Sequence, residues 1–429
     1  MNHVNYVWGG RIKMKRFKLY IVWGMVVLLM LFSLTTLSIA QQKEPIKIGA
    51  IVSFTGIQAE TGPECEHAVA TGVDLLNAKG GIHGYPVSVT LVDGESKPAV
   101  FATKAHRLLE SVKVVAGFGG IDISYATAAG KVFQDAKTPF LDIAGTTPTI
   151  PLVGDYMFMT PFPDNDQGRA TAKYIYEKLG CDTITIFKDV ASAYGTKLTE
   201  YIIYYFKEFT GKENPVPFVP CYNTGDTDFT AQLIRLKANI KKLGIQAIVL
   251  PCWVSDAPKI AKQARELGIE LPLIGTDGVD TQSLIEVGGD AVEGMIFCTH
   301  ASPYQPGLPD IAKEFSKKYE KKYGEEAGAF GTMGYDSLMI EAEAISLVIE
   351  EKGEEWWDET SLADKRTAIR DKMSTMKSTW TTQPITFTPE GWPKKAVIWK
   401  VVKNGKRCFC DFQSYDSYTP EGIETLPFK

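Results

Sequence analysis

The feature that most constrains the fold is a regular alternation of strand and helix patterns, which occurs in two successive runs. The first run contains strand patterns at 46–54, 86–93, 112–119 and 140–143. The second run contains them at 183–187, 216–220, 246–250, 271–275 and 294–298. Helical patterns separate the strands in both runs, as in "DFTAQLIRLKANIKKLG". Such alternation predicts two doubly wound α/β lobes with parallel sheets.

The remainder of the chain is less regular. Helical patterns dominate from 309 to about 351. The segment 352–376 is acidic and then basic, and its pattern assigns it no definite structure. A final strand pair is expected within "PITFTPEGWPKKAVIWKVV", joined by the turn sequence "TPEGWP".

The N-terminus has the pattern of a secretory signal peptide. Basic residues between Arg11 and Lys18 precede an apolar stretch from Leu19 to Leu37, and small residues stand at Ser38 and Ala40. This predicts a signal peptide over 1–40 with cleavage after Ala40, and therefore a periplasmic or extracytoplasmic protein. The alternative for the same stretch is an uncleaved membrane anchor.

The net charge and the positions of the cysteines and histidines argue against several kinds of partner and site. Without residues 1–40 the chain has 41 basic and 51 acidic residues, a formal net charge of −10. This balance argues against nucleic acid or an anionic membrane surface as a partner. The seven cysteines are scattered, so the sequence assigns no disulfide. No histidine has metal-type spacing with a cysteine or another histidine, and we expect neither a metal nor a cofactor.

In open α/β sheets, ligands bind beyond the carboxyl ends of the strands. The residues that follow the predicted strands are "GGIDIS" (119–124), "AGTTP" (144–148), "DVASAYG" (189–195), "PCWVSD" (251–256) and "TDGVD" (276–280). These loops contain no histidine, and no base is identifiable beside Cys252. They offer hydroxyls, backbone N–H groups, aromatic rings and acids. This composition predicts a site for a small zwitterion.

The six residues predicted to contact the ligand are Ser124, Ala144, Thr146, Tyr194, Trp253 and Asp277. Ser124 and Thr146 supply hydrogen-bond donors for a ligand carboxylate. The Asp277 carboxylate, with the Ala144 carbonyl, accepts from a ligand ammonium, because a buried charge needs a partner. Tyr194 and Trp253 cover the ligand.

Each of these positions also has a purely structural interpretation. The segment 144–146 is then a tight loop, Ser124 is a helix N-cap, and Asp277 belongs to a turn or a helix cap. Tyr194 and Trp253 are then ordinary packing residues.

Several motifs occur in one order over roughly 46–345, and they are "IKIGAIVSFTG", "NAKGGIHGYPV", "LVDGESKPA", "TPFLDIAGTTP", "DNDQGRATAKYI", "AYGTKL", "DFTAQLIRLK" and "IGTDGV". In this order the chain resembles the type I periplasmic solute-binding proteins of ABC importers, in particular the branched-chain amino-acid (leucine/isoleucine/valine) family. The resemblance implies two lobes joined by three crossovers. It places residues 41–161 and 300–377 in lobe 1, and residues 162–299 and 378–429 in lobe 2.

The resemblance implies a monomeric receptor that captures an amino acid between closing lobes and delivers it to an ABC permease. Asp277 departs from the family, whose branched-chain receptors have the longer glutamate there. Alternatives are a receptor for amides, urea or aromatic acids, and a ligand-sensing module of the same fold. A secreted hydrolase using Cys252 or a serine is a further alternative from another class. We do not expect the protein to be an enzyme.

Overall fold

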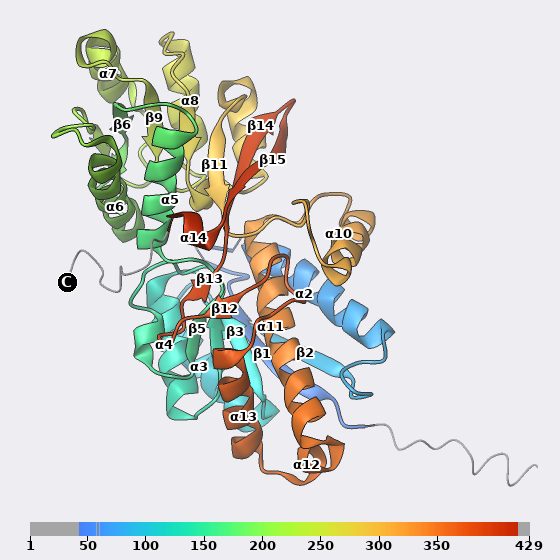
Figure 1. Cartoon of the computed structure of the whole chain (residues 1–429). Coiled ribbons are helices and arrows are strands. Elements are labelled where there is room, and N and C mark those ends of the chain that lie inside the picture. The colour runs from blue at the N-terminus through green and yellow to red at the C-terminus, as the bar shows by residue number, and fades with distance from the viewer. Residues whose placement is uncertain (1–42, 57, 60, 419–429) are drawn as a thin grey trace, which may run out of the picture. The chain divides into compact units, whose positions relative to one another are not determined.

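The computed structural model describes residues 43–56, 58–59 and 61–418 (Figure 1). The described residues from 45 to 418 belong to one compact unit. The signal peptide predicted over 1–40 lies outside the described residues. Within the described ranges, no helix has the length and apolar character needed to cross a membrane.

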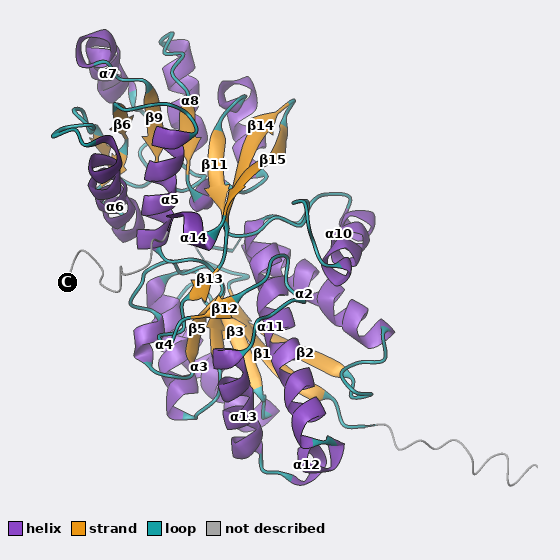
Figure 2. Ribbon diagram, in the orientation of Figure 1, coloured by secondary structure: helices purple, strands orange, loops and turns teal. Residues whose placement is uncertain are grey.

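The first sheet is entirely parallel, and its strands lie in the order β2-β1-β3-β4-β5. The strands are β1 (Ile46–Val52), β2 (Val87–Asp93), β3 (Ala116–Gly119), β4 (Phe140–Asp142) and β5 (Met157–Met159). Helices lie on both faces of this sheet (Figure 2). They are α2 (Thr61–Ala78), α3 (Pro98–Arg107), α4 (Ile123–Asp135), α10 (Asp310–Tyr323), α11 (Ala329–Lys352), α12 (Glu354–Glu359) and α13 (Leu362–Thr375).

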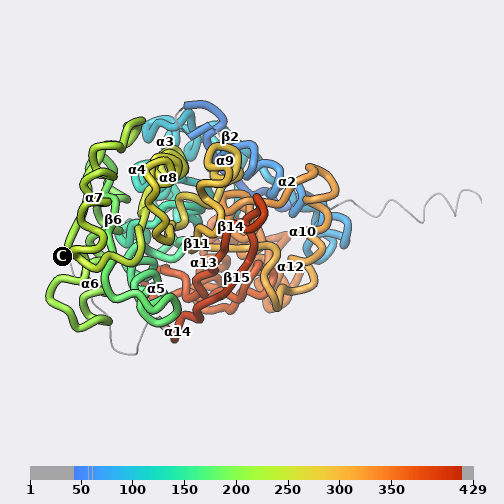
Figure 3. Tube along the Cα trace, turned by 90° about the horizontal axis from the view of Figure 1, so that it is seen from above, coloured from blue at the N-terminus to red at the C-terminus, as the bar shows by residue number. Residues whose placement is uncertain are grey.

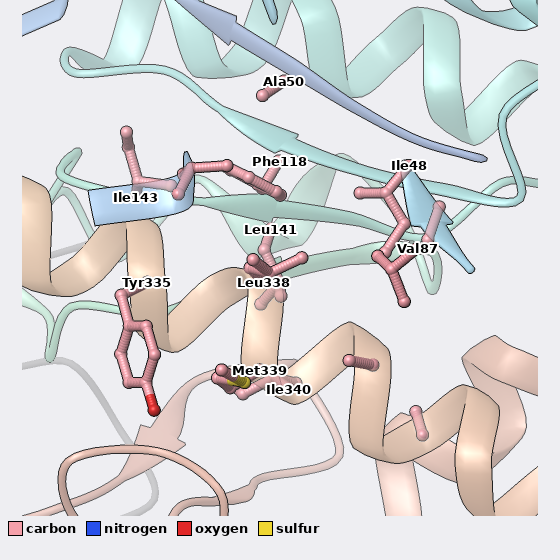
Figure 4. Packing of buried hydrophobic residues seen from close by; sticks show 14 of the residues in the cluster. Ile48, Ala50, Val87, Phe118, Leu141, Ile143, Tyr335, Leu338, Met339 and Ile340 are labelled. Carbon is pink, nitrogen blue, oxygen red and sulfur yellow. The ribbon is translucent and has the colours of Figure 1, made fainter. Parts of the chain in front are cut away.

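Helix α11 forms the centre of the first core. It is apolar on nearly all sides, and such a helix must be covered on all sides by other elements. Figure 4 shows Tyr335, Leu338 and Met339 of α11 below the strand residues Phe118 and Leu141. All five side chains are at most 1 % exposed. This packing fixes the sheet whose strand ends carry the predicted binding loops.

The second sheet is mixed, with the order β15-β14-β11-β10-β9-β6. Its parallel strands are β6 (Ile184–Ile186), β9 (Ala247–Leu250), β10 (Leu273–Gly275) and β11 (Ile296–Thr299). The antiparallel strands β14 (Val397–Lys403) and β15 (Lys406–Gln413) extend this sheet beside β11 (Figure 3). The helices are α5 (Asp164–Glu177), α6 (Ala193–Thr210), α7 (Thr230–Leu243), α8 (Ala257–Glu266), α9 (Ser283–Gly288) and α14 (Tyr415–Tyr418). The doubly wound α/β class is thereby confirmed.

The final strand pair predicted around the "TPEGWP" turn is present, but it is much shorter than the sequence pattern suggested. The "TPEGWP" turn joins only the short antiparallel strands β12 (Thr386–Phe387) and β13 (Pro393–Lys394). The long strand β14 pairs instead with β11 and β15, because its buried face completes the second core. A further short pair, β7 (Lys188–Asp189) with β8 (Cys221–Tyr222), lies beside the second sheet.

Three segments connect the parts of the chain that contain the two sheets. They are residues 160–163 after β5, residues 300–309 after β11, and residues 376–396 before β14. Hydrogen bonds link the three segments to one another. The Lys395 ammonium donates to the Thr160 carbonyl at 3.1 Å, and the Gln383 amide donates to the His300 carbonyl at 3.1 Å. We call 160–163, 300–309 and 376–396 the crossing segments.

The lobe boundaries of the sequence analysis stay a prediction. Phe387 packs against Phe158 of β5 with ring centroids 5.0 Å apart, and the Met159 N–H donates to the Gly391 carbonyl at 3.1 Å. These contacts favour a third crossing close to Lys395, C-terminal to the predicted boundary at 378.

Candidate functional site

The predicted loops follow the carboxyl ends of parallel strands. Residues 143–148 follow β4, residues 251–256 follow β9, and residues 276–280 follow β10. Helix α6 starts at Ala193, inside the predicted "DVASAYG" loop, so that Tyr194 occupies its first turn. The sheet geometry therefore presents these loops at strand ends, where open α/β sheets bind ligands.

Asp277 is the centre of the site. It begins a 3-10 helix directly after β10, and its side chain is 11 % exposed. Its Oδ1 atom accepts from the Tyr194 hydroxyl and from the Gln167 amide, both at 2.5 Å. Its Oδ2 atom lies 2.9 Å from His300 Nε2. Three donors on three elements thus fix the position of this carboxylate.

These donors also set the charges at the site. Burial alone would raise the pKa of Asp277, but His300, Tyr194 and Gln167 outweigh burial and hold that pKa below its usual value. Burial lowers the pKa of His300, and Asp277 offsets only part of this effect. At neutral pH the pair is therefore an ionised carboxylate that accepts from a neutral imidazole.

A second buried acid lies near Asp277. Asp164 is the first residue of α5 and is 2 % exposed. Its N–H donates to the Thr146 carbonyl at 2.7 Å, and the Thr146 hydroxyl hydrogen-bonds to its carboxyl group. The pKa of Asp164 is raised to about 7. Burial is the main cause, the negative charge of Asp277 raises it as well, and the Thr146 hydroxyl lowers it in part. Asp164 therefore connects the 144–148 loop to Asp277.

Three acceptor positions at and near Asp277 are left without a hydrogen-bond partner among the described residues. A carboxylate has about four lone-pair positions, and the described donors use three of those on Asp277. Asp164 Oδ1 and Gln167 Oε1 are buried and have no hydrogen-bond partner among the described residues. In the described contacts, neither acid is paired with a lysine or arginine. The three N–H groups of an ammonium match this arrangement in number and in charge.

The two predicted aromatic residues lie side by side. The rings of Tyr194 and Trp253 have centroids 5.2 Å apart and planes inclined by 41°. Trp253 comes from the loop after β9, yet it packs against the core built around the first sheet. The Tyr194 hydroxyl, besides donating to Asp277, lies 2.7 Å from the Thr276 hydroxyl. The structure thus brings Thr146, Tyr194 and Asp277 close to Asp164, and Trp253 packs on Tyr194.

Ala144 belongs to the same loop as Thr146 and is 6 % exposed. Its N–H and that of Gly145 face the carboxyl group of the fully buried Asp142. A Cβ on Gly145 would lie 2.6 Å from Ile150 Cδ1 and 3.0 Å from Asp142 Oδ2, so this close packing favours glycine. Burial raises the pKa of Asp142 well above its usual value.

Ser124, like Ala144, has no described contact with Asp277. It is exposed in the first turn of α4, and its hydroxyl and its N–H both bond to Asp122 Oδ1, at 2.8 and 2.9 Å. The N-cap of α4 is Asp122, one of the neighbours noted in "GGIDIS". The roles of all six predicted residues in ligand binding remain proposals.

The sequence analysis missed Asp164, Gln167 and His300. Asp164 and Gln167 belong to "DNDQG", which opens the helix after the segment that follows β5. His300 directly follows β11, so applying the strand-end rule to the strand at 294–298 would have identified it. For the described residues, the structure contains no cluster of three metal-ligating side chains, and the seven cysteines form no disulfide.

Two doubly wound sheets linked by three crossing segments define the class of type I periplasmic binding proteins. A family profile described as "Periplasmic binding protein" matches residues 45–393. The chain therefore belongs to the periplasmic binding protein family.

Similar proteins bind branched-chain amino acids. The chain is 28 % identical over 255 residues to the Leu/Ile/Val-binding protein of Escherichia coli K12, covering 59 % of this chain and 67 % of that protein. It is 24 % identical over 311 residues to the leucine-, isoleucine-, valine-, threonine- and alanine-binding protein of Pseudomonas aeruginosa, covering 72 % of this chain and 80 % of that protein.

Solved structures of branched-chain amino-acid-binding proteins are similar to this chain over most of its length. The leucine-binding protein LivK of Thermotoga maritima has a TM-score of 0.70 at 28 % identity, covering 86 % of this chain and 99 % of that chain. LivJ of Streptococcus pneumoniae, in complex with isoleucine, has a TM-score of 0.71 at 25 % identity, with the same coverage. A solute-binding protein from R. palustris in complex with benzoate shares the fold at 18 % identity.

Proposed function

We propose that this protein is the extracytoplasmic substrate-binding component of an ABC importer, and that it captures an amino acid, branched-chain or similar. The observation that carries the proposal is the set of acceptors around Asp277, which matches a ligand ammonium. The names of the similar proteins support a branched-chain side chain. A transport role further implies an ABC permease as partner and a monomeric receptor exported through residues 1–40.

The proposed mechanism is a shift between open and closed forms. Thr146 comes from a strand end of the first sheet, whereas Tyr194, Trp253 and Asp277 come from elements of the second. A ligand that contacts both groups stabilises the form in which they are close together. In this proposal the part of the chain that contains the first sheet moves relative to the part that contains the second, and the three crossing segments form the hinge.

An aromatic acid fits this site less well than an amino acid. Such a ligand has a carboxylate and no ammonium, and it would face Asp277 and Asp164 without a cation in return. Placing like charges together in a buried site costs free energy. This argument favours amino acids over the benzoate-type ligand of the more distant structural relative.

Thermal-shift measurements test the proposal. Residues 41–429 are heated with a panel of amino acids, aliphatic amides, urea and aromatic acids. A ligand at about 100 times its dissociation constant adds about 2.7 kcal/mol of stability, which raises the melting temperature by a few degrees. We expect a rise only with α-amino acids, and no product release. A rise only with amides, urea or aromatic acids would contradict the ammonium assignment.

Replacing Tyr194 with phenylalanine should weaken amino-acid binding by about tenfold. The change removes a donor to the ionised Asp277 carboxylate, and a hydrogen bond to a charged group contributes about 1.5–3 kcal/mol. Calorimetric titration measures the affinity. Tyr176→Phe is the matched control, because Tyr176 is 38 % exposed. Equal affinities for Tyr194→Phe and the control would show that Tyr194 does not orient Asp277 for the ligand.

A further inference from the structure

His300 has a position that the amino-acid site alone does not explain. It is the first residue after β11 and opens the second crossing segment, and its side chain is fully buried. No residue adjacent to it in sequence belongs to the predicted site. Its contacts nevertheless reach the site and the other two crossing segments.

His300 contacts Asp277 of the candidate site and one residue in each of the other two crossing segments. Nε2 lies 2.9 Å from Asp277 Oδ2. The imidazole ring lies against Phe162 of the first crossing segment, with ring centroids 3.9 Å apart. The His300 carbonyl accepts from the Gln383 amide of the third crossing segment at 3.1 Å. Gln383 also accepts from the Ala396 N–H at 2.8 Å, beside the start of β14.

We propose that His300 is a positioning residue that couples ligand binding at Asp277 to the arrangement of the three crossing segments. The inference rests on the proposed function, since it needs a ligand cation at Asp277. Because one buried ring contacts both the ligand-binding carboxylate and the first crossing segment, moving either group repositions the other. Ligand binding is thereby connected to closure through a side chain that does not touch the ligand.

The coupling has an electrostatic component. The charged groups that face the imidazole are Asp277 and Asp280 from the segment after β10, and Lys395 from the third crossing segment. The two acids favour an imidazolium, whereas Lys395 and burial oppose it. Lys395 in turn faces Asp336 of α11. A ligand ammonium bound at Asp277 offsets the negative charge that most favours protonation of His300.

Protonation of His300 and binding of the ligand therefore oppose each other. Since the pKa of His300 is lowered from its usual value, the opposition is absent at neutral pH and grows as the pH falls below that pKa. In that range a fully coupled proton reduces the affinity by about tenfold per pH unit. Asp164 also becomes protonated as the pH falls, with a pKa of about 7, so its contribution must be separated from that of His300.

Two substitutions in the full-length protein separate these roles. His300→Gln retains an N–H donor for Asp277 but cannot be protonated, whereas His300→Phe retains the ring and removes the donor. His106→Gln is the control, because His106 is an exposed histidine of α3. The affinity for isoleucine is measured between about pH 5 and 7.5 by calorimetry, and the ligand-induced decrease in radius of gyration by X-ray scattering.

We expect His300→Gln to bind within about threefold of wild type at neutral pH and to lose less affinity on acidification. We expect His300→Phe to bind about tenfold more weakly, the effect of losing a donor to a charged group, and to show a smaller scattering change. The remaining pH dependence of His300→Gln then belongs to Asp164. Wild-type affinity, pH profile and scattering change in both variants would overturn the coupling while leaving the proposed function intact.

A ligand-free measurement keeps the two ideas distinguishable. In protein labelled with ¹⁵N-histidine, Asp277→Asn should shift the imidazole nitrogen signals of His300, whereas Asp290→Asn at an exposed position should not. Failure of wild-type protein to bind any ligand would overturn the proposed function, and with it the coupling to ligand. Unchanged His300 signals in Asp277→Asn would overturn the His300–Asp277 pair itself.

Discussion

Replacing Asp277 with asparagine should reduce the affinity for an amino acid by more than about a hundredfold, because removing one partner of a buried, hydrogen-bonded charge pair costs about 2–5 kcal/mol. Asparagine has nearly the same shape but lacks the negative charge, so the ammonium would be buried without a counter-charge. The asparagine amide would also place N–H donors in a cluster that already contains donors from Tyr194, Gln167 and His300. Calorimetric titration with isoleucine measures the effect.

The matched control is Asp290→Asn, an exposed aspartate in the same part of the chain. It should bind as wild type. Melting temperatures of the ligand-free variants show whether each protein is folded. If folded Asp277→Asn binds isoleucine as tightly as Asp290→Asn does, Asp277 is not the ammonium partner.

Replacing Asp280 with asparagine should destabilise the protein by about 3–5 kcal/mol, which lowers the melting temperature by about five degrees. Asp280 is fully buried, and its two oxygens accept from Lys400 at 2.8 Å and Arg407 at 2.5 Å. Those two cationic side chains are only 4 % and 7 % exposed, so the substitution leaves buried charges without their anion.

The pH dependence of stability provides a second test of Asp280. Burial would raise its pKa, but Lys400 and Arg407 outweigh burial and lower that pKa to about 2. Since the pKa of the folded state lies below that of the unfolded state, the stabilisation is complete above about pH 4 and is lost as the pH falls towards 2. Urea denaturation across this range should show a steeper loss of stability in wild type than in Asp280→Asn.

Asp182→Asn is the control for Asp280. Asp182 pairs with Lys212 at 2.7 Å, but the two side chains are 47 % and 43 % exposed. Exposed ion pairs of this kind contribute at most about 1 kcal/mol. Equal melting temperatures for Asp280→Asn and Asp182→Asn would show that the buried triad does not stabilise the second sheet.

The sequence predicted the fold class and the position of the binding loops because both depend on local patterns. Strand and helix periodicities can be recognised within a few residues, and parallel sheets place every strand's carboxyl end at one edge. Asp277 and Tyr194 were therefore located without knowledge of their contacts. The contact between these two side chains in the structure follows from strand-end geometry, and their role in ligand binding stays a prediction.

The contacts that determine charge could not be predicted in this way. Asp280 is paired with Lys400 and Arg407, which lie more than a hundred residues later in the chain. His300 meets Phe162 and Gln383 only because three crossing segments converge. The pairing of β14 with β11 is also non-local, and the turn at "TPEGWP" predicted only the short pair β12–β13. Long-range pairing of this kind leaves no short-range pattern in a single sequence.

The shorter acid at the proposed ammonium position is held in place by several donors. Asp277 replaces the glutamate that resemblance to the branched-chain receptors leads one to expect, and it reaches one methylene less far. Donors from α5, α6 and the crossing segment after β11 hold the carboxylate in place.

The most direct test of the central claim is a calorimetric titration of the wild-type protein at neutral pH with isoleucine and with its deaminated analogue, 3-methylpentanoate. The two ligands share the side chain and the carboxylate and differ in the ammonium. We predict saturable one-to-one binding of isoleucine and no measurable binding of the analogue. Equal binding of both would contradict the ammonium site at Asp277, and binding of the analogue alone would show that the acids in this site serve another purpose.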